Sequence, residues 1–254
     1  MSAPKKIAVA GATGRVGRHL VDILEAEGHE VAAMSRSRGV DIITGDGLAE
    51  ALTGAEAIVD AATGPSPEEH AATEFFTTAA RNLQEAGERA GVQRIVVVSI
   101  IGSDRFSGGY GAAKVAHEQA TLSGPIPGRV LRAAQFHEFV AQLMEWGARG
   151  DVTYVPRMRT QLVAAKTAAQ ALADLATASD EAEPSILEIA GPREERLVEM
   201  ATLLAARRGD AARVEEASDP ADPAHAVFES GALLPGPDAT LAGPTFAEWL
   251  NGAA

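Results

Sequence analysis

The sequence contains no cysteine, few aromatic residues and no long apolar run. Because all 254 residues lack cysteine, disulfides, thiolate catalysis and cysteine-based metal sites are excluded. Aromatic residues make up only 4% of the chain, so we expect a core of small and aliphatic side chains. No apolar run approaches the roughly 20 residues that a membrane-spanning helix requires. We therefore predict neither a membrane span nor a metal site.

Positive charge is also scarce. The chain carries 22 lysines and arginines against 35 aspartates and glutamates, which gives a formal net charge of −13. Nucleic acids and anionic membranes bind basic surfaces, so we predict that neither is a partner. The N-terminal residues, Met-Ser-Ala-Pro-Lys-Lys, contain no apolar signal segment, and we expect a cytoplasmic location.

What the sequence does contain is an alternation of short β-rich runs with longer helical patterns, which is typical of a parallel sheet. The predicted fold class is therefore α/β, a doubly wound parallel sheet of the Rossmann type. We expect strands at residues 6–10, 30–35, 40–44, 57–61, 94–99 and 129–132. Helices are expected at residues 15–27, 69–90, from about 110, and at 136–148.

After residue 150 the alternation becomes less regular. We predict a dinucleotide-binding Rossmann core at residues 1–150 and a smaller C-terminal substrate-binding lobe at 151–254, partly interleaved with the core. The lobe is expected to contain strands at 152–155 and 186–189, helices at 167–178, 197–208 and 246–250, and a loop at Asp219–Pro223.

The first predicted strand runs into a glycine-rich turn, Gly-Ala-Thr-Gly-Arg-Val-Gly at residues 11–17, and then into an amphipathic helix. Gly11 permits a tight turn, Gly14 lets the backbone approach a pyrophosphate, and Gly17 lets the helix pack closely on the strand. The helix N-terminus offers free N–H groups to the anion. Because of this strand–turn–helix context, the motif predicts a dinucleotide site rather than a turn without a ligand.

The residues after the second strand indicate which dinucleotide binds. Proteins that prefer NAD usually carry an acidic residue there, which accepts the ribose hydroxyl. This chain has Ser35-Arg36-Ser37-Arg38 instead, and a guanidinium attracts a 2′-phosphate. The predicted cofactor is therefore NADP(H). The alternative is that Arg36 and Arg38 are solvated loop charges.

Two further loops follow predicted strands on the cofactor side. Asp46 is a candidate for capping the adenine amino group, and a helix N-cap is the equal alternative. Ala61, Ala62 and Thr63 form a loop of small residues that suits backbone passing beneath a cofactor, although it would suit any tight strand–helix connection.

A candidate catalytic set comes from the fifth predicted strand and the helix after it. Ser99 ends the strand, and Tyr110 and Lys114 lie four residues apart on one face of the helix. A nearby ammonium would lower the pKa of the phenol, so that Tyr110 could exchange a proton while Ser99 holds the substrate oxygen. The alternative is that the Tyr-x-x-x-Lys spacing arises by chance and Tyr110 is a structural aromatic.

The glycine turn, Val-Ser-Ile-Ile-Gly at residues 98–102, Leu-Arg-Ala-Ala-Gln-Phe-His-Glu-Phe at 131–139 and the terminal Phe-Ala-Glu-Trp-Leu resemble the short-chain dehydrogenase/reductase superfamily. The resemblance covers essentially the whole chain and is strongest to the atypical NmrA-like group, which includes triphenylmethane reductase and an NADPH:quinone oxidoreductase. It implies NADPH binding at the turn and at Arg36, with Lys114 near the ribose. It also implies that the segment from Ala134 to His137 borders the nicotinamide and the substrate.

The residues predicted to bind the cofactor are Gly11, Thr13, Gly14, Arg15, Val16, Gly17, Ser35, Arg36, Asp46, Ala61, Ala62, Thr63, Lys114, Ala134 and Phe136. Those predicted to line the substrate pocket are Ile100, Gln135 and His137. For His137 a structural role is an open alternative. His70 and His117 lie on predicted helices without metal-ligand partners, and we expect both at the surface.

The leading hypothesis is an NADPH-dependent oxidoreductase that transfers hydride to a small apolar acceptor, such as a quinone, an enone or a ketone. The alternative is a catalytically silent NADP(H)-binding redox sensor. Sugar-nucleotide epimerase chemistry shares the fold and the Tyr-Lys pair, but the C-terminal region is small for a nucleotide-sugar pocket. We expect a small-molecule substrate and leave open a monomer or a homodimer.

Overall fold

The structure is a computed structural model and describes residues 3–178, 185–218 and 224–252. Within these residues a central sheet of seven strands has the order β12-β9-β5-β4-β3-β1-β2. β1 pairs in parallel with β2 on one side and with β3 on the other, so the strand order reverses there. The predicted α/β fold of the Rossmann type is confirmed. The strands are β1 (Lys6–Ala10), β2 (Glu30–Met34), β3 (Ala57–Asp60), β4 (Arg94–Ile100), β5 (Gly128–Ala133), β9 (Ile186–Ala190) and β12 (Thr240–Leu241).

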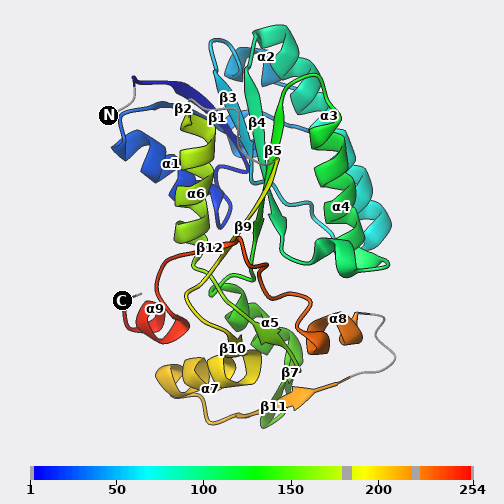
Figure 1. The fold of residues 1–254 in the computed structure, drawn as a ribbon, viewed down its shortest axis with the longest axis vertical. Coiled ribbons are helices and arrows are strands. Elements are labelled where there is room, and N and C mark those ends of the chain that lie inside the picture. Colours follow the sequence, from blue (N-terminus) through cyan, green and yellow to red (C-terminus); the bar gives the residue numbers. More distant parts are fainter. Residues whose placement is uncertain (1–2, 179–184, 219–223, 253–254) are drawn as a thin grey trace. The chain divides into compact units, whose positions relative to one another are not determined.

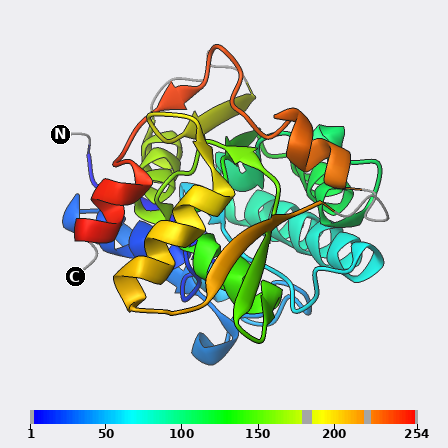
Figure 2. The ribbon, with the colours of Figure 1, turned by 90° about the horizontal axis from the view of Figure 1, so that it is seen from below.

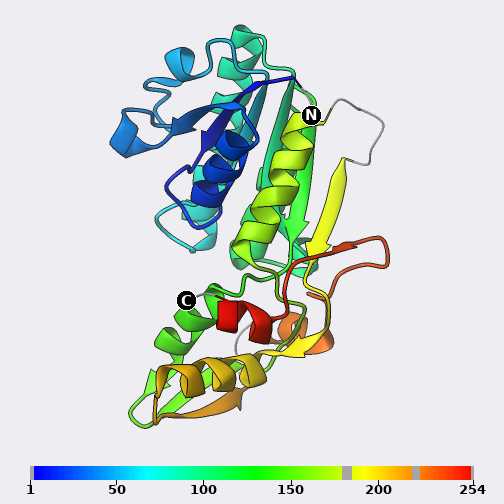
Figure 3. The ribbon, with the colours of Figure 1, turned by 90° about the vertical axis from the view of Figure 1, so that its left-hand side faces the viewer.

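Helices cover both faces of this sheet. Helices α1 (Gly17–Ala26) and α6 (Ala165–Thr177) lie on one face, and α3 (Glu69–Ala90) and α4 (Gly109–Leu122) lie on the other (Figures 1 and 3). Leu20 and Leu24 of α1 are fully buried, as their spacing on one helical face predicts. Gln170 of α6 donates a hydrogen bond to Glu27 at the end of α1.

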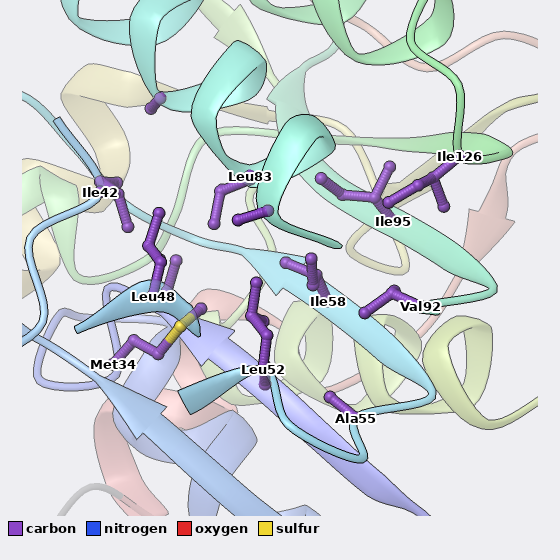
Figure 4. Close-up of a cluster of buried hydrophobic side chains, with 14 residues drawn as sticks. Met34, Ile42, Leu48, Leu52, Ala55, Ile58, Leu83, Val92, Ile95 and Ile126 are labelled. Carbon is purple, nitrogen blue, oxygen red and sulfur yellow. The ribbon is translucent and has the colours of Figure 1, made fainter. Parts of the chain in front are cut away.

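Aliphatic side chains fill the space between α3 and the sheet, as the composition predicts. Figure 4 shows Ile58 of β3, Ile95 of β4 and Leu83 of α3 among the side chains of this cluster, together with Leu48 from the short helix α2 (Leu48–Ala51). Each of these four side chains is essentially inaccessible to solvent. Burial of this apolar surface is the main favourable contribution to the stability of this layer.

The strand predicted at residues 40–44 is wrong, because this segment forms a series of turns. The Asp41 carboxylate accepts the N–H groups of Ile43 and Thr44, and the Asn82 side chain donates to the carbonyls of Ile42 and Ile43. These bonds occupy backbone groups that a strand would offer to β2. The apolar pattern reflects the burial of Ile42 in the cluster of Figure 4 rather than strand pairing.

The chain forms two compact units, which we describe separately. The first comprises Met1–Ser99, Gly108–Arg132 and Ala168–Leu187, and the second comprises Ile100–Ser107, Ala133–Thr167 and Glu188–Ala254. Both units thus draw on the predicted core and on the predicted lobe. The assignment of residues 151–254 to substrate binding stays a prediction.

In the second unit, β7 (Val152–Pro156) pairs with β6 (Ala148–Arg149) and with β11 (Arg213–Ala217), and α5 (Phe139–Gly147) and α7 (Leu197–Arg208) pack beside it (Figure 2). The sequence predicts α7 to the residue, but it does not predict β11. The predicted loop at Asp219–Pro223 lies outside the described residues. The remaining elements are β8 (Arg159–Thr160), β10 (Glu195–Arg196), α8 (His225–Ser230) and α9 (Phe246–Gly252).

Candidate functional site

The turn between β1 and α1 has no room for side chains at two of its glycines. Gly11 adopts a positive φ of 71°, and a Cβ there would lie 2.7 Å from the carbonyl oxygen of Ala61. A Cβ on Gly17 would overlap the carbonyl oxygen of Gly11. The backbone of the turn therefore sits against the loop after β3, at the point where the strand order reverses. Ligands of open α/β sheets bind at such a point.

The start of α1 suits an anion. Val16 occupies the N-cap position without a side-chain hydrogen bond, and the first turn of the helix contains no acidic residue. Thr13 and Gly14 are exposed in the turn, whereas Val16 is buried and Arg15 is half-buried. Because the N-cap side chain makes no bond to these N–H groups and the first turn of the helix contains no carboxylate, the described residues of the turn fit the pyrophosphate of a dinucleotide.

The residues after β2 are basic and open to solvent. Arg36, Ser37 and Arg38 form one turn of 3-10 helix and are exposed, and the hydroxyls of Ser35 and Ser37 share a hydrogen bond of 3.0 Å. The first acidic residue after β2 is Asp41, whose carboxylate is engaged in the turn described above. The side chains that directly follow β2 are thus basic or hydroxyl-bearing rather than acidic.

Asp46 is exposed and accepts a hydrogen bond of 2.7 Å from the Thr44 hydroxyl. The N-cap of α2 is Gly47, so the alternative that Asp46 caps this helix is wrong. Its contact with an adenine stays a prediction.

The loop after β3 packs against the glycine turn on one side and approaches α4 on the other. The Asp60 carboxylate accepts the N–H of Ala62 at 2.9 Å, which fixes the loop where Gly11 packs against it. Ala61 and Ala62 are half-buried, and Thr63 is exposed. The Thr63 hydroxyl is near enough to the Tyr110 hydroxyl of α4 to lower the pKa of the phenol.

Ser99 and Tyr110 differ in their hydrogen bonding. Ser99 is only 3% exposed, and among the described residues its hydroxyl has no hydrogen-bond partner. A buried hydroxyl without a partner is costly, and a ligand oxygen would satisfy it. For Tyr110, burial raises the pKa of the phenol, and the nearby Thr63 hydroxyl opposes the rise.

Lys114 is buried and fully engaged in the interior. Its ammonium donates to the carbonyl of Val98 at 2.8 Å, lies 3.0 Å from Nδ1 of His117 and sits 4.2 Å from the centre of the Phe76 ring. Burial lowers the pKa of Lys114 to about 8, with Asp60 and Glu118 opposing the change. Among the described residues, Lys114 and Tyr110 share no hydrogen bond, so the expected phenol–ammonium contact is not formed here.

His117 is not at the surface, and that prediction is wrong. The ring is fully buried, stacks on Phe76 at 4.7 Å between centres, and contacts Asp60 through Nε2 at 3.1 Å. Helical periodicity explains the error, because His117 follows Tyr110 and Lys114 by seven and three residues and shares their face. His70, by contrast, is exposed as predicted.

The predicted substrate residues lie in the second unit. His137 donates from Nε2 to the Pro244 carbonyl at 3.1 Å and contacts the rings of Phe246 and Trp249. Burial lowers the pKa of His137 to about 4. These contacts hold α9 in place and support the structural alternative for this histidine.

The other predicted substrate and nicotinamide residues of this unit also have protein partners. The side-chain oxygen of Gln135 accepts from the Thr160 hydroxyl at 2.6 Å, and Phe136 forms a parallel bridge with Val163. Ala134 is buried, and Ile100 is half-buried. Their contacts with a substrate or a nicotinamide stay predictions.

Comparison with known proteins agrees with this geometry. Residues 11–122 match the NAD(P)H-binding family, and this segment contains the glycine turn, Arg36, Ser99, Tyr110 and Lys114. The N-terminal part of the chain is thus similar to NAD(P)H-binding proteins. The resemblance to the short-chain dehydrogenase/reductase-like NAD(P)-binding group is confirmed, whereas membership of the NmrA-like subgroup stays a prediction.

Three solved structures illustrate the shared fold. The NADPH-dependent quinone oxidoreductase QOR2 from Escherichia coli is 18% identical, with 97% of this chain and 99% of that chain covered and a TM-score of 0.67. A short-chain dehydrogenase/reductase superfamily protein from Agrobacterium tumefaciens with bound NAD is 18% identical, with coverages of 84% and 85% and a TM-score of 0.62. MoeE5 in complex with UDP-glucose and NAD is 18% identical, with coverages of 97% and 96% and a TM-score of 0.68.

Two further findings concern the described residues alone. None of their helices is both long and apolar enough to span a membrane. Nor do they contain a group of three histidine, aspartate or glutamate side chains that could hold a metal ion.

Proposed function

We propose that this protein is an NADPH-dependent oxidoreductase that transfers hydride to a small apolar acceptor, with quinones as the favoured class. The glycine turn and the uncapped start of α1 support binding of the pyrophosphate. Arg36 and Arg38 support NADPH over NADH, because guanidinium groups bind a phosphate through paired hydrogen bonds. When bound, the nicotinamide supplies a hydride. The unpaired hydroxyl of Ser99 is the group that would hold the acceptor oxygen.

The choice of a quinone over a ketone rests mainly on the surroundings of the Tyr110 phenol. The Lys114 ammonium is engaged by Val98 and His117 and, among the described residues, makes no hydrogen bond with the Tyr110 phenol, so the phenol lacks the cation that would make it a stronger acid. Reduction of a ketone creates an alkoxide, which requires a proton as the hydride arrives. Reduction of a quinone by hydride creates a phenolate-type anion, and its conjugate acid is a phenol like the tyrosine side chain, whose ordinary pKa is about 10. A quinone therefore depends least on an activated Tyr110.

The proton balance follows from the same contacts. The quinone gains a hydride at the ring system, which supplies two electrons, and the resulting oxyanion takes one proton. Tyr110 can donate that proton and regain one from the Thr63 hydroxyl, which is exposed and can exchange with water. The products are a hydroquinone and the oxidised dinucleotide.

The cofactor preference is tested by titrating the cofactor-free protein with NADPH and with NADH and following the nicotinamide fluorescence. We expect NADPH to bind at least about tenfold tighter, which corresponds to about 1.4 kcal/mol. Arg36→Ser should remove most of this preference, whereas Arg89→Ser, an exposed arginine at the end of α3, should not. Equal affinities in the unchanged protein would mean that Arg36 is a solvated charge.

The acceptor class is tested with NADPH and two probes, 1,4-naphthoquinone and cyclohexanone. We expect turnover of the quinone but not of the ketone. A protein that strongly prefers one redox form of the cofactor and reduces no acceptor would instead support the redox-sensor alternative. A cytoplasmic location and the choice between monomer and homodimer stay predictions.

A further inference from the structure

A chain of three buried polar side chains links β3 to α4. Oδ2 of Asp60 lies 3.1 Å from Nε2 of His117, and Nδ1 of His117 lies 3.0 Å from Nζ of Lys114. The three residues are 1%, 0% and 4% exposed, respectively. Burying two charged groups is costly unless they are paired and hydrogen-bonded, so this arrangement is not a by-product of packing.

The chemistry of the donors fixes the proton positions. An ammonium has only donors, so Nδ1 of His117 must accept from Lys114, and the ring proton must therefore be on Nε2. Nε2 then donates to Asp60, and both oxygens of Asp60 accept hydrogen bonds, which favours its ionised form. Burial works to raise the pKa of Asp60, but its bonds with His117 and Ala62 and the nearby charges hold it below its ordinary value. Burial and the Lys114 charge lower the pKa of His117, which keeps the ring neutral.

Asp60 also acts on the opposite side. Its second oxygen accepts the N–H of Ala62 and so holds the loop that carries Thr63. The Thr63 hydroxyl is near Tyr110, which lies on the same face of α4 as Lys114 and His117. The Asp60 carboxylate thus contacts His117 of α4 directly through one oxygen. Through the other oxygen it holds the loop that places Thr63 near Tyr110 of the same helix.

Phe76 of α3 packs against the side chains of Tyr110, Lys114 and His117 on α4. Its side chain stacks on His117, makes an edge contact with Tyr110 at 5.7 Å between ring centres, and receives the Lys114 ammonium at 4.2 Å. The remaining charged group nearby on α4 is Glu118, which is paired through both oxygens with Arg132 of β5. Lys114 therefore has its partners in the interior, on β4, α3 and its own helix.

We propose that Asp60 and His117 are positioning residues for Lys114: they fix its ammonium between α4 and β4, where it makes no hydrogen bond with Tyr110. The proposal rests on the oxidoreductase function proposed above, because it explains why Tyr110 works there without an ammonium partner. Neither residue touches the reacting atoms. Both act through the position of Lys114 and of the loop at residues 61–64.

The first experiment locates the His117 proton by ¹⁵N NMR of the full-length, cofactor-free protein with labelled histidine, with the signal assigned by its loss in His117→Asn. We expect a neutral ring with its proton on Nε2 at pH 7. Asp60→Asn removes the charged acceptor of the Nε2–H bond and should shift the Nε2 resonance, while the Lys114 ammonium keeps the proton off Nδ1. Glu118→Gln, a matched change of a neighbouring buried carboxylate, should leave the Nε2 resonance unchanged. A proton on Nδ1 in the unchanged protein, or no response to Asp60→Asn, would overturn the proposal.

The second experiment measures the ionisation of Tyr110 by ¹³C NMR. The chain has only 2 tyrosines, so Tyr154→Phe assigns the signal. We expect a pKa above 10 that does not rise in Lys114→Met. A pKa below 10 that rises in Lys114→Met would mean that the ammonium acts on the phenol directly, and the proposal would be wrong.

The third measurement tests positioning during turnover. Asp60→Asn should lower kcat with 1,4-naphthoquinone about tenfold or more and leave the dissociation constant of NADPH within about threefold. An unchanged kcat would contradict a positioning role. If the unchanged protein reduces no quinone, the proposed function fails, but the His117 tautomer and the Tyr110 pKa still decide the role of Asp60 and His117.

Discussion

The two halves of the candidate site differ in the groups that form them, which are backbone groups in one half and side chains in the other. The half that would hold the pyrophosphate is made of backbone, with glycines that leave no space for a Cβ. The half around Tyr110 is made of side chains from β3, α3 and α4, which are distant in sequence. The backbone half is determined by a short stretch of sequence, whereas the side-chain half exists only after the sheet and helices have assembled.

This difference explains what substitution can do to each half. In the backbone half, an added methyl group collides with a carbonyl that cannot move without distorting β1 or α1. In the side-chain half, a replaced group loses partners, and the remaining groups can find others. We therefore expect all-or-none effects on cofactor binding at the turn and graded effects on proton transfer and stability around Tyr110.

The largest effect is expected for Gly17→Ala. Its Cβ would overlap the Gly11 carbonyl, so either the turn or the start of α1 must move. We expect the NADPH dissociation constant to rise by about a hundredfold or more, together with a lower melting temperature. Gly252→Ala, at the end of α9 where a Cβ would meet no neighbour, is the matched control and should change neither. Normal NADPH affinity in Gly17→Ala would show that the turn tolerates displacement.

An intermediate effect is expected from Lys114→Met, and it depends on pH. The pKa of Lys114 is lowered from 10.5 to about 8 in the folded protein. Between these values the unfolded chain binds more protons than the folded one, so Lys114 makes stability rise with pH, by roughly 3 kcal/mol in total. That contribution is lost as pH falls through about 8.

The measurement is urea unfolding of both proteins at pH 7.5 and 10. The difference in unfolding free energy between Lys114→Met and the unchanged protein should favour the methionine variant most at the lower pH. A difference that is constant with pH would mean that Lys114 is not held as a buried cation.

The smallest effect is expected for Thr63→Val, which keeps the shape of the side chain but removes the hydroxyl near Tyr110. We expect kcat with a quinone to fall about threefold to tenfold with unchanged NADPH affinity, because the proton path to water is broken. Thr202→Val, whose hydroxyl bonds only within α7, is the matched control. A large loss of NADPH affinity in Thr63→Val would instead assign the threonine to cofactor binding.

The sequence allows the backbone half to be predicted well. The order strand–glycine turn–helix is local, and the structure contains β1, the turn and α1 close to the expected residues. Helices with a long amphipathic pattern, such as α3 at Glu69–Ala90, are also predicted correctly. The segment at residues 40–44 is not, because an aspartate at its start and Asn82 from α3 bind its backbone.

The side-chain half could be predicted only in part. Tyr110 and Lys114 share a helical face, and this much is visible in the spacing. Nothing local indicates that Asp60, at the end of an apolar strand, faces His117, which is 57 residues away in sequence. The signal that was available is Asp60 itself, because a carboxylate that ends a buried strand requires a partner.

The packing of Trp249 against His137 has a practical consequence for spectroscopy. Both tryptophans of the chain, Trp146 and Trp249, belong to the second unit, so the first unit has no indole emission of its own. Energy transfer from indole to a reduced nicotinamide requires the two to be close. Quenching of tryptophan emission by NADPH would thus report how near the second unit lies to the cofactor, and Trp146→Phe would assign the signal to Trp249.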